Sequence, residues 1–80
     1  MFVCHLQAAM ADIRPERIVS INLCTDQLAL MLADPAQVKS VTYMAADPRG
    51  SVMAREAAGI PINRGTAEEV LALEPDLVLG

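Results

Sequence analysis

Short runs of β-branched and other apolar residues recur at intervals along the chain. Runs of this kind are typical of strands that are buried on both faces of a parallel sheet. The segments between them are richer in alanine, leucine and acidic residues and have the longer period of helices. The pattern predicts four strands, which lie within residues 17–21, 38–43, 60–63 and 77–80.

The segment after the first predicted strand has the periodicity of an amphipathic helix. Asp26 and Gln27 fall on its polar side, and Asp34 followed by Pro35 ends the pattern. The apolar residues occupy positions i, i+4, i+7 and i+8 and are predicted to form the packed face of the helix: Cys24, Leu28, Met31 and Leu32.

A second helix is predicted between the second and third strands. Asp47 followed by Pro48 suits an N-cap and a first helical position, and Gly59 suits the position just past the end. Gly50 lies inside this segment and weakens the helix, because glycine has a low helix propensity.

The strongest local signal is a capping box ahead of the third predicted helix. Thr66 is expected to cap the helix, with Glu69 reaching back to the Thr66 amide. Pro75 ends the helix. Its apolar face is predicted from Val70, Leu71 and Leu73.

This alternation of strands and helices predicts an α/β fold with a parallel sheet and right-handed βαβ connections. In such folds, ligands bind in loops at the carboxyl ends of the strands. A chain of 80 residues supports one domain at most, and its small core predicts marginal stability. The fourth strand leaves an unpaired sheet edge.

Composition and charge exclude several classes of protein. The chain is 54% apolar, which excludes a disordered linker, and its core must be aliphatic because Phe2 and Tyr43 are the aromatic residues. The formal net charge is −4, and no cationic cluster is present. Nucleic-acid binding is therefore disfavoured, since it depends on clustered cations that release counterions.

Residues 1–11 have features of a truncated signal peptide. A short apolar run is followed by Ala9-Met10-Ala11, the small-x-small pattern that precedes signal-peptidase cleavage. No Lys or Arg precedes the run, which is also short for an export signal. The alternative is a loosely packed terminus with an accidental match. The chain has no apolar segment of about 18 residues that could span a membrane.

The motifs of common catalytic and metal sites are missing from the sequence. There is no glycine-rich phosphate loop and no G-x-S-x-G turn, which disfavours nucleotide binding and serine hydrolysis. His5 is the single histidine, and together with Cys4 and Cys24 it does not make a zinc site. Cys24 is interpreted as a packing residue rather than a reactive thiol. No catalytic residue, metal ligand or cofactor is predicted.

Two segments carry a resemblance to a known family. The first is RIVSINLCTDQ at residues 17–27, and the second is GTAEEVLALEPDLVLG at residues 65–80. Together they resemble the start of the ABC-importer substrate-binding proteins for cobalamin and ferric siderophores. The second segment, with its helix-P-D-L-V-strand pattern, is the more specific. The resemblance covers nearly all of residues 14–80.

The resemblance implies a function in capture and delivery rather than catalysis. Members of the family have two α/β lobes joined by a long helix, and they hold a metal chelate in the cleft. Residues 14–80 would form part of the N-terminal lobe, without the connecting helix or second lobe. The expected location is the periplasm, if the leader functions. The alternatives are a scaffold piece of an α/β enzyme, whose catalytic residues lie elsewhere, and a pseudogene fragment without activity.

The same resemblance, combined with strand position, suggests site residues. Tyr43, Asn63 and Arg64 lie at or just beyond the carboxyl ends of predicted strands and are the candidate ligand contacts for a ferric siderophore, haem or cobalamin. Tyr43 could stack on a flat macrocycle. Glu68 matches the family's acidic residue that docks onto the ABC permease dimer of the inner membrane.

Overall fold

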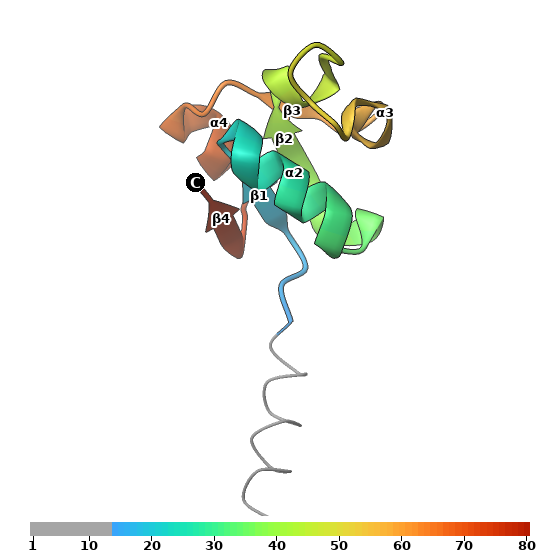
Figure 1. Cartoon of the computed structure of the whole chain (residues 1–80). Coiled ribbons are helices and arrows are strands. Elements are labelled where there is room, and N and C mark those ends of the chain that lie inside the picture. The colour runs from blue at the N-terminus through green and yellow to red at the C-terminus, as the bar shows by residue number, and fades with distance from the viewer. Residues whose placement is uncertain (1–13) are drawn as a thin grey trace, which may run out of the picture.

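The computed structural model describes residues 14–80, which contain one four-stranded sheet. All of its paired strands are parallel, and their order is β3-β2-β1-β4 (Figure 1). The predicted α/β arrangement is confirmed, whereas the predicted leader in residues 1–11 lies outside the described residues. The strands are β1 (Ile18–Ser20), β2 (Val38–Thr42), β3 (Ile62–Asn63) and β4 (Leu77–Leu79).

Helices connect the successive strands. The longest, α2 (Leu23–Leu32), links β1 to β2 and packs against both strands. The other α-helices are α3 (Ala54–Ala57) and α4 (Ala67–Ala72), and two short 3₁₀ helices follow α2 and β2: η1 (Pro35–Gln37) and η2 (Tyr43–Ala46). The four predicted strands and the first and third predicted helices are therefore confirmed.

The packed face of α2 differs from the predicted one. Asp26 and Ala29 are the buried residues of this helix, whereas Cys24 is exposed and Leu32 is 81% exposed. Small side chains allow the helix to approach the sheet closely, and Asp26 is buried because Thr42 of β2 satisfies its carboxylate. The predictions of a packed Cys24 and of a polar side at Asp26 were wrong.

The second predicted helix is much shorter than expected. The carboxylate of Asp47 accepts hydrogen bonds from the backbone and side chain of Arg49, and a turn follows instead of a helix. The Gln27 side chain then accepts from the Met53 amide and donates to Ser51, so contacts with α2 replace helical hydrogen bonds. Only α3 remains helical.

The start of α4 follows the predicted capping box in part. The Thr66 hydroxyl accepts from the Glu69 amide at 3.2 Å. The Glu69 carboxylate accepts from the Arg64 amide at 3.0 Å and from the Thr66 hydroxyl, rather than pairing mainly with the Thr66 amide. These hydrogen bonds, the one from Arg64 first, lower the pKa of Glu69. Gly65 precedes the cap with a positive φ of 77°, which glycine tolerates.

The core is small and lies mainly between α2 and β2. It consists of short aliphatic side chains without a fully buried leucine or aromatic residue among the described residues. Partly buried residues such as Leu30, Ile60 and Leu79 extend it. The buried members of the main cluster are Ala29, Val38, Val41, Ala45 and Ala57.

Arg17 and Asp76 join the two segments of the family resemblance at the amino end of the sheet. The Asp76 carboxylate accepts from the amides of Glu16 and Arg17 at 2.9 and 2.8 Å. In return, the Arg17 guanidinium donates to the carbonyls of Leu73 and Glu74, at the end of α4. This clamp aligns the start of β4 with the start of β1.

The clamp predicts a specific loss of stability in acid. The hydrogen bonds from the Glu16 and Arg17 amides hold the pKa of Asp76 below its ordinary value of 3.8. Its ionised form is therefore favoured by folding, and this contribution is present above that value and lost as the pH falls through the lowered pKa. We expect Asp76→Asn to reduce stability at neutral pH. The midpoint of urea unfolding should also fall less steeply with decreasing pH in this variant than in the unaltered chain.

Glu56→Gln provides the control, because Glu56 is an exposed acid on α3. Its unfolding midpoint should follow that of the unaltered chain at every pH. If the midpoint of Asp76→Asn fell with decreasing pH as steeply as that of the unaltered chain, the clamp would have no role in acid stability.

Candidate functional site

The carboxyl ends of β2 and β3 place two of the predicted ligand contacts beside each other. Thr42 and Asn63 are register partners at the ends of these neighbouring parallel strands. Tyr43 and Arg64 follow them directly, so both side chains emerge at the same edge of the sheet. This placement agrees with the expectation from strand position.

Tyr43 and Arg64 form a stacked pair. The guanidinium carbon of Arg64 lies 5.7 Å from the centre of the Tyr43 ring, within the range of a cation–π contact. Tyr43 is 51% exposed and Arg64 is exposed. Within residues 14–80 the one salt bridge joins Arg49 to Asp47, and the charge of Arg64 acts on the Glu69 carboxylate without forming a salt bridge. The pair therefore offers a flat ring and an exposed guanidinium to solvent.

Asn63 does not belong to the exposed surface. It is 1% exposed, and its side-chain amide bonds to the backbone and side chains of the neighbouring strands. A ligand that reached this amide would have to replace these hydrogen bonds. The structure thus places Asn63 beneath the surface, apart from the other two predicted ligand contacts.

Glu68 lies near the same end of the sheet. It occupies the first turn of α4, which begins soon after the carboxyl end of β3. Its side chain is exposed, whereas Glu69 is engaged with the cap. Glu68 is also favourably placed for the helix dipole, which stabilises negative charge in the first turn.

The surface beyond the carboxyl ends of β1 and β2 contains a shallow depression. It has a volume of about 400 Å³ and is lined by residues that follow the carboxyl ends of β1 and β2. Arg49 contributes a guanidinium that is paired with Asp47 at 2.8 Å. The lining residues are Leu23, Met44, Asp47, Arg49 and Gly50.

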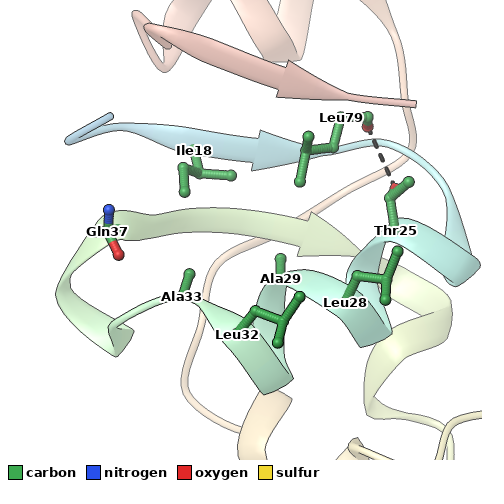
Figure 2. Close-up of a pocket in the computed structure, with 8 residues that line it drawn as sticks. All are labelled: Ile18, Thr25, Leu28, Ala29, Leu32, Ala33, Gln37 and Leu79. Atoms are coloured by element: carbon green, nitrogen blue, oxygen red, sulfur yellow. Dashed lines mark hydrogen bonds between the residues drawn. The ribbon is translucent and has the colours of Figure 1, made fainter. Parts of the chain in front are cut away.

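A second, apolar groove lies along the side of α2, away from Tyr43 and Arg64. Figure 2 shows that Leu28 and Leu32 of α2 lie opposite Ile18 of β1 and Leu79 of β4. The groove has a volume of about 400 Å³, and no charged side chain lines it. The hydroxyl of Thr25 donates to the Leu79 carbonyl at one end. This lining suits packing with apolar groups rather than recognition of an anion.

The described residues provide no assembled metal site. Across residues 14–80, no three His, Cys, Asp or Glu side chains are grouped closely enough to hold a metal ion. None of the helices in this part of the chain has the length and apolar character needed to cross a bilayer.

Comparison with known proteins adds no relative. No family model, curated protein or solved structure matches the chain. The resemblance to chelate-binding proteins stays a prediction. The function must therefore be inferred from the surface itself.

The buried polar residues under the surface are the part of the site that the sequence analysis missed. Asp26 was expected on the polar side of its helix, yet it is fully buried and bonded to Thr42. Ser40 is also buried, and it bonds to Asn63. The polar residues within the predicted second strand were the available signal, because a buried strand carries hydroxyl groups only where they find partners.

Proposed function

We propose that this chain is part of the first lobe of an exported protein that captures a metal chelate and delivers it to an ABC permease dimer in the inner membrane. The chelate is a ferric siderophore, haem or cobalamin. No bond is made or broken in the chelate. Residues 1–11 would serve as the export leader.

The stacked pair of Tyr43 and Arg64 is the observation that supports this proposal. The ring supplies a flat apolar face and the guanidinium supplies a positive charge, which together suit a large anionic or macrocyclic ligand. The pair lies at the carboxyl ends of parallel strands, where α/β folds bind ligands. A depression of about 400 Å³ is lined in part by Met44, the residue that follows Tyr43 in η2.

Nuclear magnetic resonance titration tests the proposal. Gallium(III) forms of a hydroxamate and a catecholate siderophore, gallium protoporphyrin and cobalamin serve as diamagnetic probes. We expect shifts of the Tyr43 ring and the Arg64 guanidinium with at least one probe, at a Kd in about the millimolar range for a single lobe. The metal-free siderophores are the control. Unchanged signals at both residues with all four probes would reject chelate capture.

Glu68 provides a test of delivery that is separate from capture. In the protein that carries both lobes, we expect Glu68→Ala to leave chelate affinity and the unfolding midpoint nearly unchanged. Stimulation of the permease ATPase in proteoliposomes should fall, because loss of an exposed charge at an interface slows association and weakens docking.

Glu56→Ala is the matched control, since Glu56 is an exposed acid on a different helix. It should support ATPase stimulation as well as the unaltered protein does. Equal stimulation by Glu68→Ala at physiological salt would assign Glu68 to stabilising the start of α4 alone.

A further inference from the structure

Two buried polar side chains are bonded to the backbone next to the exposed Tyr43–Arg64 pair. Asp26 is 0% exposed, and Asn63 is 1% exposed. Burial of a carboxylate or an amide is unfavourable unless its hydrogen bonds are satisfied. In the described part of the chain every buried polar side-chain atom has a partner. The partners of Asp26 and Asn63 therefore indicate what these residues hold in place.

Asp26 fixes the backbone from which Tyr43 emerges. Its carboxylate accepts from the Thr42 amide at 3.2 and 3.3 Å and also from the Thr42 hydroxyl. Thr42 is the last residue of β2, and Tyr43 follows it as the first residue of η2. The carboxylate, carried by α2, thus holds both the main chain and the side chain at the point where the strand turns into η2.

Asn63 fixes the loop that carries Arg64. Its Nδ2 donates to the Ser20 carbonyl, the Ser40 hydroxyl and the Val41 carbonyl, which connects β3 to both β1 and β2. Its Oδ1 accepts from the Gly65 amide at 2.9 Å. Since Asn63 and Gly65 flank Arg64, this contact closes the turn around it.

We propose that Asp26 and Asn63 are positioning residues that preorganise the Tyr43–Arg64 pair for its ligand. A stacked cation and ring at an exposed site attract each other weakly, so their arrangement depends on the backbone that carries them. Asp26 and Asn63 fix that backbone through hydrogen bonds and do not occupy the exposed faces of the ring and the guanidinium. This inference deepens the proposed function and rests on the assignment of the pair as the ligand contact.

The Tyr43 ring provides a spectroscopic signal for the test. Tyr43 is the single tyrosine of the chain, which has no tryptophan, so the tyrosine band of the near-ultraviolet circular dichroism spectrum comes from this ring alone. Asp26→Asn replaces one carboxylate oxygen by an amide donor, which then faces either the Thr42 amide or the Thr42 hydroxyl, both of them donors to Asp26. We expect it to abolish the tyrosine band and the nuclear Overhauser contacts between Tyr43 and Arg64, while the far-ultraviolet spectrum persists.

Ser51→Ala is the matched control. Ser51 is also a buried polar residue bonded to α2, through Gln27, but it does not contact Thr42 or Asn63. It should keep the tyrosine band. In the protein with both lobes, affinity for the gallium siderophore should fall about tenfold in Asp26→Asn and in Asn63→Ala, and not in Ser51→Ala.

If Asp26→Asn does not fold, conservative variants at Thr42 test whether Asp26 positions Tyr43. Thr42→Ser keeps the hydroxyl that donates to Asp26 and should keep the tyrosine band, whereas Thr42→Val removes it and should weaken the band. A band of full strength in folded Thr42→Val or Asp26→Asn would overturn the positioning role. Loss of the band in these variants, with no probe bound by the unaltered chain, would keep the positioning role and reject the proposed ligand.

Discussion

Val41→Ala is expected to lose much of its folded population. Val41 is 0% exposed and, with Val19, is the largest of the fully buried side chains of the described residues. Removal of its two methyl groups forfeits burial and leaves a cavity, which together cost about 2 kcal/mol. That loss lowers the folded-to-unfolded ratio by about thirtyfold, which is large against the marginal stability that the small core predicts. Urea unfolding followed by circular dichroism measures it.

Val52→Ala makes the same chemical change at a surface position. Val52 is 87% exposed, so its variant should stay within about 0.5 kcal/mol of the unaltered chain. Equal unfolding midpoints for the two variants would show that the cluster around Val41 does not stabilise the fold.

Tyr43→Ala is expected to weaken chelate binding by about tenfold or more in the protein with both lobes. The change removes the flat ring on which a macrocycle or siderophore would stack, and it also removes the surface on which Arg64 rests. Folding should be affected little, because about half of the side chain is already exposed. Since the variant lacks the tyrosine reporter, affinity is measured by calorimetry with the gallium hydroxamate siderophore.

Tyr43→Phe separates stacking from hydrogen bonding. Phenylalanine keeps the ring, so affinity close to that of the unaltered protein indicates stacking, whereas a loss as large as that of alanine indicates that the hydroxyl contacts the chelate. Unchanged affinity in Tyr43→Ala would remove Tyr43 from the site and leave it as a cover for the end of the sheet.

The strands were predictable because their local sequence and their environment agree. The run around Val19 is apolar and β-branched and lies in the middle of the sheet. Thr66 was predictable as a cap for a similar reason, since its bond to the Glu69 amide is made within one turn of chain. The location of Tyr43 and Arg64 together, at the carboxyl ends of their strands, was predictable from strand direction alone.

The remaining features depend on partners distant in sequence, which a local pattern does not contain. The periodicity of the first helix placed Asp26 on its solvent side, because a carboxylate is rarely buried. The local sequence does not identify Thr42, 16 residues away, as its hydrogen-bond partner. Asn63 was predicted as a ligand contact from its position at a strand end. Whether such a side chain points outward or back into the sheet depends on the acceptors that neighbouring strands present, here the carbonyls of Ser20 and Val41.

The clamp between Arg17 and Asp76 also bears on the order of folding. It joins residues that are 59 positions apart, whereas the contact that ties Pro15 to Gln37 at the start of β2 spans 22. Closing the longer loop costs about 1 kcal/mol more chain entropy. β4 is therefore expected to join a sheet that has already formed from the earlier strands, and to detach first when the domain opens. Such an opening would uncover the edge of β1 and leave intact the pairing of β2 with β3, the strands that precede Tyr43 and Arg64.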